Sequence, residues 1–250
     1  MSGLLLAGDV YIDRYDDNGN STGLVGPLNA TQLQLNTPSE SVDRPSKRKE
    51  SYGQALDSVT LASSSEITIV FDDQPAEMLA MALMGEVEET AQGADTVVDG
   101  LVTLPKGNRW AVLPFTNLTE SGLSAKLASD DSAIPGAGYE VNYADGMIRT
   151  TPGGALDTGT ATPIKLSYGY AAVNKVIIKG GIKPTINARV LLKGKNLATG
   201  KAVEADILKA SLAPTQAVDL LSSEYVSTTL GGKAILVDGE TAPFYLTETK

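Results

Sequence analysis

The 250-residue sequence contains no cysteine and no histidine, and only 5% of its residues are aromatic. Without cysteine the chain can form no disulfide bond and can carry out no thiolate chemistry. Without histidine it lacks the commonest metal ligand and the side chain best suited to general base catalysis at neutral pH. These two absences argue against most enzyme classes and leave carboxylate chemistry open.

Long apolar runs are also missing. Nowhere do about 18 apolar residues follow one another, so no membrane-spanning helix is expected. The N-terminal stretch MSGLLLAGDV has a short apolar run with no basic residue before it. It therefore differs from a secretory signal and is expected to be an ordinary first strand. Apolar residues make up 42% of the chain, which is enough for a packed core.

Charge is unevenly distributed along this acidic chain, whose formal net charge is −10. Residues 50–105 contain eleven acids and no base, whereas residues 175–209 contain eight bases and two acids. A second basic group, Arg44 with Lys47, Arg48 and Lys49, occupies only six positions. Such asymmetry predicts surfaces of opposite potential that could steer one copy onto another, with solvated strand faces as the alternative.

Short segments of alternating apolar and polar residues dominate the sequence and predict strands. In the first segment Val10 and Ile12 share one face, and the turn DDNGNSTG then leads into LNATQLQLNT, which predicts a hairpin. In SEITIVFDD, residues 65–73, Ile67, Ile69 and Phe71 share a face. Further strands are expected at residues 139–143, 147–151, 163–170, 175–180, 187–196, 201–211, 233–239 and 243–248.

One helix is expected at PAEMLAMALMG, residues 75–85, where Pro75 and Glu77 suit the first turn. Gly85 is expected to end it. A second short helical piece could form at residues 214–222. The first helix is expected to pack on the sheet through an apolar stripe of Met78, Leu79, Ala82 and Leu83.

These elements predict a mainly β fold: an antiparallel β-sandwich or partial barrel with one short α-helix covering an end or open side. Residues 106–172 differ in character because aromatic residues and turn signals gather there. Residues 1–105 and 173–250 are therefore expected to form the core. The span 106–172 is either a β-rich insertion or supplies integral strands of the same sandwich.

No catalytic, cofactor or metal site is expected. Asp157-Thr158-Gly159-Thr160 matches the nucleophile turn of aspartic peptidases, in which two carboxylates share a proton, but the chain has no second copy. A hairpin turn is the favoured interpretation.

The acids Glu86, Glu88 and Glu89 are expected in an exposed loop. The pairs Gly180-Gly181 and Gly231-Gly232 are interpreted as turn glycines. No aromatic residue interleaves the run Arg44–Lys49, which argues against a nucleic-acid patch.

The order of these elements resembles the tail tube (major tail) proteins of long-tailed bacteriophages over most of the chain. The resemblance begins with the opening hairpin GLLLAGDVYIDRYDD…GLVGPLNATQLQLN and a long polar loop that ends in SYGQALDSV. It continues through the strand SEITIVFDD and the helix PAEMLAMALMG. It closes with the strands NARVLLKGKNLATGKAVEADILKASL and LGGKAILVDG.

The resemblance implies a structural virion protein whose hexameric rings stack into a hollow tube that delivers DNA to the host. Residues 36–57 match the loop that reaches the next ring, with Arg44, Lys47, Arg48, Lys49 and Tyr52 as its contact residues. An acidic lumen would let DNA slide without sticking. The candidate lumenal acids are Asp9, Asp13, Glu66 and Asp72, each of which alternates with apolar residues on an expected strand.

The implied partners are other copies of the chain and the tape-measure, tail terminator and tail tip proteins. DNA would pass without sequence-specific contacts, and no cofactor is implied. The implied location is the virion tail, preceded by the host cytoplasm during assembly. Two alternatives remain: a secretion-system tube subunit of the same fold, and an aspartic peptidase that uses Asp157.

Overall fold

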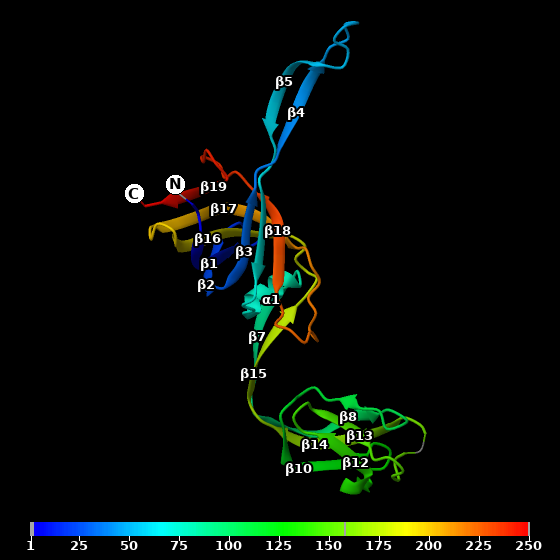
Figure 1. Cartoon of the computed structure of the whole chain (residues 1–250). Helices are drawn as coiled ribbons and strands as arrows, with labels where there is room; N and C mark the ends of the chain where they lie inside the picture. The colour runs from blue at the N-terminus through cyan, green and yellow to red at the C-terminus, as the bar shows by residue number, and fades with distance from the viewer. Residues whose placement is uncertain (1–2, 158, 250) are drawn as a thin grey trace. The chain divides into compact units, whose positions relative to one another are not determined.

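The computed structural model describes residues 3–157 and 159–249 and confirms a mainly β fold with antiparallel sheets and a single short α-helix. The chain divides into two compact units (Figure 1). Unit 1 comprises Met1–Glu88 and Ile178–Lys250, and unit 2 comprises Glu89–Ile177. Each unit has its own buried apolar cluster.

Unit 1 is built on an eight-stranded sheet with the order β2-β1-β16-β17-β18-β6-β3, in which β19 also pairs with β17. The edge strands β2 and β3 are joined by the single residue Asn29, so the sheet curls until its two edges come together there. The strands are β1 (Leu6–Tyr15), β2 (Ser21–Leu28), β3 (Ala30–Asn36), β6 (Glu66–Phe71), β16 (Ile186–Asn196), β17 (Ala202–Pro214), β18 (Thr228–Ala234) and β19 (Phe244–Glu248).

The core of unit 1 lies on one face of this sheet. Val10 and Ile12 of β1 are buried there, as are Ile67, Ile69 and Phe71 of β6. Both sets follow the period of two that the sequence displays, because successive side chains of a strand point to opposite faces. The alternation therefore predicted the buried faces of β1 and β6 correctly.

The helix α1 (Ala76–Ala82) covers this core and contacts β17 and β18. It is shorter than the expected 75–85, since Pro75 is the residue before the first turn and Leu83 the residue after the last. Met78 and Ala82 are buried as expected, but Leu79 and Leu83 are only half-buried. The other fully buried positions are Ala80 and Met81. The helix is thus rotated slightly from the predicted stripe.

We expect Met81→Ala to destabilise unit 1 by about 2 kcal/mol or slightly more, because deleting a fully buried Met leaves a cavity. The half-buried Leu79 serves as the matched control, and Leu79→Ala is expected to cost only about 1 kcal/mol. Urea titrations of both variants provide the comparison. Equal costs would show that the helix does not pack on the sheet through Met81.

The end of the helix depends on Met84 and Gly85 together. Met84 adopts a left-handed conformation with φ of 50°, and the Gly85 N–H donates to the Ala80 carbonyl over 2.7 Å. A side chain at residue 85 would place its Cβ 2.4 Å from the Lys179 carbonyl oxygen. Gly85 is therefore required by the close approach of another segment, rather than by its own backbone angles.

Two local expectations for the C-terminal part of unit 1 are wrong. Residues 215–227 form an irregular loop, not the second helix considered at 214–222, because β17 continues through Pro214. Gly231 and Gly232 lie inside β18, where they pair with β17 and β6, and are not turn glycines. In β18 the glycines permit a close approach of neighbouring backbone.

Unit 2 contains a four-stranded and a three-stranded sheet, with the orders β11-β10-β14-β8 and β12-β13-β9. Its boundary differs from the expected 106–172, because β8 pairs with β14 and so belongs with unit 2 instead of the core of 1–105. The elements are β8 (Asp95–Leu104), β9 (Ala111–Val112), β10 (Leu118–Leu127), β11 (Ala133–Ile134), η1 (Gly136–Gly138), β12 (Tyr139–Asn142), β13 (Met147–Thr150) and β14 (Thr162–Tyr170).

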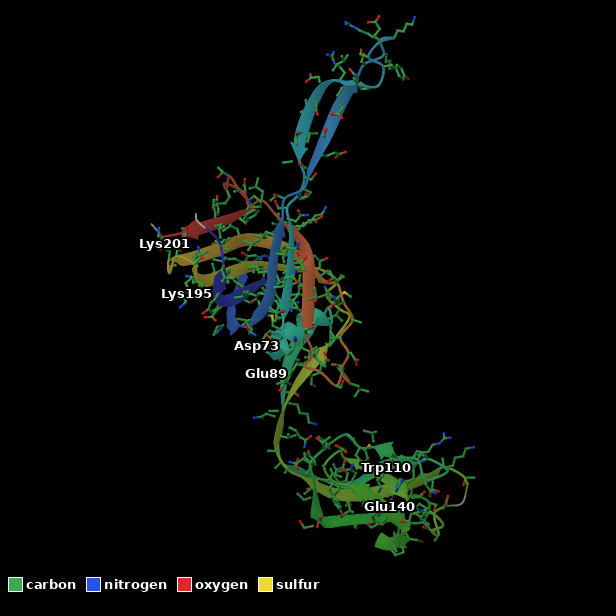
Figure 2. The ribbon with its side chains drawn as sticks, in the orientation of Figure 1. Asp73, Glu89, Trp110, Glu140, Lys195 and Lys201 are labelled. Atoms are coloured by element: carbon green, nitrogen blue, oxygen red, sulfur yellow. The ribbon has the colours of Figure 1, made fainter. Side chains whose placement is uncertain are left out.

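A separate pair of strands, β7 (Glu86–Gln92) and β15 (Val173–Lys179), carries the chain from one unit to the other and back. Within unit 2, the Arg149 guanidinium lies 4.5 Å from the centroid of the Trp110 ring. It also donates to Glu140 over 2.8 and 2.6 Å (Figure 2). This arrangement fixes β12, β13 and the Trp110 segment together at the surface of unit 2.

Candidate functional site: an exposed hairpin with a basic tip

The most exposed regular structure in the chain is the hairpin of β4 (Ser39–Pro45) and β5 (Ala55–Ala62), which pair only with each other among the described strands. Every residue of both strands is exposed to solvent. The hairpin extends from unit 1 beyond the ends of β3 and β6 (Figure 1). The expected polar loop over residues 36–57 therefore contains regular structure, since half of that span belongs to strands and the hairpin continues to Ala62.

The hairpin has two chemically different faces. The register pairs Val42 with Val59, Glu40 with Leu61 and Arg44 with Asp57, so three apolar and three charged side chains share one face. Their exposed fractions are 55% for Val42, 54% for Val59 and 51% for Leu61. The opposite face carries small or polar side chains: Ser39, Ser41, Asp43, Ser58, Thr60 and Ala62. One face of the hairpin therefore exposes a short apolar strip, Val42, Val59 and Leu61, that is flanked by charged side chains.

Exposing both faces of a hairpin to solvent lowers its stability. A two-stranded hairpin alone in water is marginally stable at best, because neither face of its strands is buried. Its unpaired outer edges can also bind another chain. The apolar side chains of β4 and β5 and the free edges of these strands are therefore accessible in the isolated chain.

Hydrogen bonds order the hairpin tip, residues 46–54. Ser46 is 1% exposed, and its hydroxyl bonds that of Ser51 over 2.7 Å and accepts from the Arg48 N–H over 3.2 Å. The Ser46 N–H donates to the Gln54 carbonyl over 2.7 Å, and the Gly53 N–H donates to the Ser46 carbonyl over 2.9 Å. The tip is thus folded around a buried serine, which reduces the entropy lost when it binds a partner.

Four cations lie at or beside the tip, and none forms an ion pair with another residue in the described ranges 3–157 and 159–249: Arg44, Lys47, Arg48 and Lys49. The tip also exposes Tyr52, whose exposed fraction is 77%. A rigid aromatic ring beside several cations can anchor an interface, because Tyr and Arg are the residues that most often dominate binding energy.

The basic segment 175–209 behaves differently, because strand pairing brings half of its cations to carboxylates. Arg189 binds Asp206 through two hydrogen bonds of 2.8 and 2.6 Å, and these raise the pKa of the guanidinium. The remaining pairs join Lys179 to Glu88, Lys183 to Asp17 and Glu86, and Lys193 to Glu204. Half of the positive charge that the sequence places in this segment is therefore paired within unit 1.

Two of the unpaired lysines in this segment, Lys195 and Lys201, flank the turn that joins β16 to β17 (Figure 2). They lie on a different part of unit 1 from the hairpin, which extends from the sheet between β3 and β6. The tip residues Lys47, Arg48 and Lys49 therefore form the densest group of unpaired cations in the described sequence.

The four candidate lumenal acids do not form one surface. Asp13 is buried and accepts hydrogen bonds from Ser21 Oγ, Thr22 N and Gly23 N over 2.6, 3.1 and 3.0 Å. It fixes the β1–β2 turn and is unavailable to line a channel. Alternation along β1 predicted its side of the sheet, but could not predict that the turn folds back over it.

The other three candidate acids are exposed and lie on two separate strands. Asp9 of β1 lies opposite Lys193 of β16 in the strand register. Glu66 and Asp72 flank β6 and accept hydrogen bonds from Asn36 and Asn29. Strands β1 and β6 are not neighbours in the sheet, so Asp9 lies apart from Glu66 and Asp72.

The acids of residues 50–105 are also dispersed. Glu86 and Glu88 pair with lysines of unit 1, whereas Asp95 and Asp99 belong to unit 2. In unit 2, the Asp157 carboxylate accepts hydrogen bonds from Gly153 N over 3.1 Å and Asn108 Nδ2 over 3.3 Å. The motif residue Thr158 lies outside the described residues. Within the described ranges, no three His, Cys, Asp or Glu side chains gather as metal ligands would.

The hairpin could have been found from the sequence by a period-two pattern that is weak but present. Glu40, Val42 and Arg44 alternate with Ser and Asp, and Asp57, Val59 and Leu61 alternate with Ser and Thr. At these alternating positions only Val42 in β4 and Val59 and Leu61 in β5 are apolar, so the pattern lacks the strength of a core strand.

The chain belongs to the family described as "Protein of unknown function UCP028589", whose model matches residues 4–243. The match spans both units and the hairpin. No curated protein matches the sequence. No helix among the described residues is long and apolar enough to cross a membrane.

Proposed function

We propose that the protein is a structural subunit of the tail tube of a long-tailed bacteriophage. Its rings would be hexameric and would stack into a hollow tube through which DNA passes to the host. The observation that carries this proposal is the exposed hairpin with its ordered basic tip. The element order that resembles tail tube proteins supplies the partner, which is another copy of the same chain.

The hairpin supports the proposal because its chemistry requires a macromolecular surface. Val42, Val59 and Leu61 expose a short apolar strip that a neighbouring copy would cover. The basic tip would then contact a carboxylate surface of that copy, and charge complementarity would fix the orientation. A contact of this kind joins two different surfaces of the same chain, so it propagates into a filament without closing.

The remaining parts of the proposal concern the lumen and the virion. A net charge of −10 for each subunit gives a tube that repels phosphate, so DNA would pass without sticking. The tape-measure protein would lie inside the tube, and the tail terminator and tail tip proteins would bind its ends. The assembled protein would reside in the virion tail after assembly in the host cytoplasm.

Negative-stain imaging of the purified protein tests the proposal. We expect hollow tubes or stacked rings at high protein concentration and monomers on dilution. Assembly should need neither nucleotide nor metal, so tube yield should be equal with and without EDTA and ATP. A protein that stays monomeric at every concentration, or that assembles only with ATP, would overturn the proposal.

A further inference from the structure

A pocket in unit 1 lies between β1, β2 and α1 and has a volume of about 350 Å³. Its floor is apolar and comes from all three elements and the start of β7: Ile12, Val25, Met78, Met81 and Val87. Its lining also includes one cation, Arg14, and four carboxylates: Asp16, Asp17, Glu77 and Glu86. The pocket thus combines a space large enough for an aromatic ring with an acidic entrance.

The charge of the rim is only partly neutralised within the chain. Lys183 pairs with Asp17 and with Glu86, where the Nζ–Oε1 distance is 3.2 Å. The Arg14 guanidinium donates to the Gly85 carbonyl over 3.1 Å. Glu77 is exposed and, within the described ranges, forms no ion pair. A cationic partner would therefore meet a favourable potential at the α1 side of the entrance.

We propose that this pocket receives the hairpin tip of the next copy, with the Tyr52 ring on its floor and Lys47, Arg48 and Lys49 against its acidic rim. This inference rests on the proposed function, because it needs copies that bind head to tail. The tip has the required chemistry: one highly exposed aromatic residue, three unpaired cations and an ordered backbone. A buried Tyr contributes about 150–250 Å² of contact surface.

A second cavity in unit 1 differs from the first in the charged side chains that line it, and this difference favours the first as the site for the basic tip. It shares Arg14 and the β1–β2 turn residues, but its wall also contains Lys183 and Lys209. Lys183 also pairs with Asp17 and Glu86 of the first pocket, so the two cavities differ in two other respects. Lys209 adds a positive charge to the second alone, whereas Glu77 and Glu86 line only the first. The pocket beside Glu77 and Glu86 is therefore the better match for Lys47, Arg48 and Lys49.

The topology of unit 1 places the tip and the pocket at opposite ends. Strands β3 and β6 are antiparallel, and the hairpin connects them at the end where Asn36 faces Glu66. The helix α1 follows β6 at the other end, where Ala30 faces Phe71 (Figure 1). The strands β3 and β4 are each seven residues long, which is about 23 Å each. A chain therefore presents its tip away from its own pocket, as head-to-tail binding requires.

Because the chain contains no cysteine, disulfide trapping can test this contact without background. The double variant Tyr52→Cys/Glu77→Cys, oxidised after assembly, should give a ladder of covalent multimers on a non-reducing gel. A mixture of the two single variants should give dimers and no ladder. Asp238 is an exposed acid outside the pocket, so Tyr52→Cys/Asp238→Cys is the matched control and should give no ladder.

A charge variant gives a second, independent readout. Glu77→Lys should lower tube yield at least tenfold at low salt, whereas Asp238→Lys should leave it within twofold of the wild type. Tubes that form without a Tyr52–Glu77 ladder would overturn the docking inference and leave the proposed function standing. A wild-type protein that never assembles would overturn both. Equal ladders from the Glu77 and Asp238 pairs would show that the trapping is not specific and would also overturn the inference.

Discussion

Replacing Lys47, Arg48 and Lys49 with glutamate is expected to abolish stacked tubes and to leave the subunit folded. The three side chains project from the hairpin tip and form no ion pair with the described residues. Tip folding depends on Ser46, Ser51 and Gly53, which the substitutions leave unchanged. The variant should therefore have the circular dichroism spectrum and the urea midpoint of the wild type.

The effect on assembly is large because the change is repeated. An exposed ion pair contributes only about 0–1 kcal/mol. At each ring junction, however, three favourable contacts per subunit would become repulsive, and every subunit of the ring contributes one tip. The loss per junction is the sum over the ring, so tubes should be undetectable at concentrations where the wild type assembles fully.

Salt dependence separates this mechanism from a general loss of solubility. Charges on the tip and on its partner are screened over about 8–10 Å at physiological ionic strength. Wild-type tube yield should therefore fall as salt rises, and the variant should gain slightly because its repulsion is screened.

The matched control carries the same change in net charge on three other lysines that form no ion pair within the described ranges: Lys195, Lys201 and Lys233. Replacing them with glutamate should leave tube yield nearly unchanged. Normal tubes from the tip variant would remove the tip from the assembly contact, and equal losses from both variants would assign the effect to net charge alone.

The sequence predicted the strands whose side chains alternate strongly and failed where pairing decides the structure. The faces of β1 and β6 follow directly from Val10, Ile12, Ile67 and Ile69, because burial of one face imposes a period of two. The segment that forms β8 was not among the expected strands, and it was assigned to the core of residues 1–105 although it pairs with β14 in unit 2. Strand partners are not a local property of the sequence.

Strand pairing also decides which of the charged residues remain unpaired, and the sequence alone does not show this. The run that contains Lys47, Arg48 and Lys49 is noticeable in the sequence by its density, but its place at the tip of an ordered hairpin depends on the pairing of β4 with β5. The bases of residues 175–209 looked similar in sequence. Strand register then placed Arg189 beside Asp206 and Lys193 beside Glu204, which pairs part of that positive charge.

Glycine was the residue type most easily misread. In the pair Gly231-Gly232 the absence of a side chain suggested a turn, because glycine weakens a strand. Within β18 the same absence is needed for backbone contact, since a Cβ on Gly232 would lie 1.8 Å from the Ser211 carbonyl oxygen. The requirement arises from strand β17, about 20 residues earlier in the chain, and no local pattern reports it.

The substitution Gly232→Val is therefore expected to prevent unit 1 from folding stably. Overpacking a core ordinarily costs about 1–3 kcal/mol, because side chains can move aside. Here the obstacle is the main chain of β17, which is held by β16 on one side and by β18 on the other. We expect a cost above about 4 kcal/mol, which places it among the exceptional single substitutions.

The adjacent glycine supplies the matched control for this prediction. A Cβ on Gly231 would meet the Thr215 methyl group at 2.7 Å, and a side chain in a loop can rotate away. Gly231→Val should therefore cost only the ordinary 1–3 kcal/mol or so. For a unit of this size, 1 kcal/mol corresponds to about 2–4 °C in Tm, so calorimetry distinguishes the two variants. If both variants melted at the same temperature, the β17–β18 spacing would not be what selects glycine at residue 232.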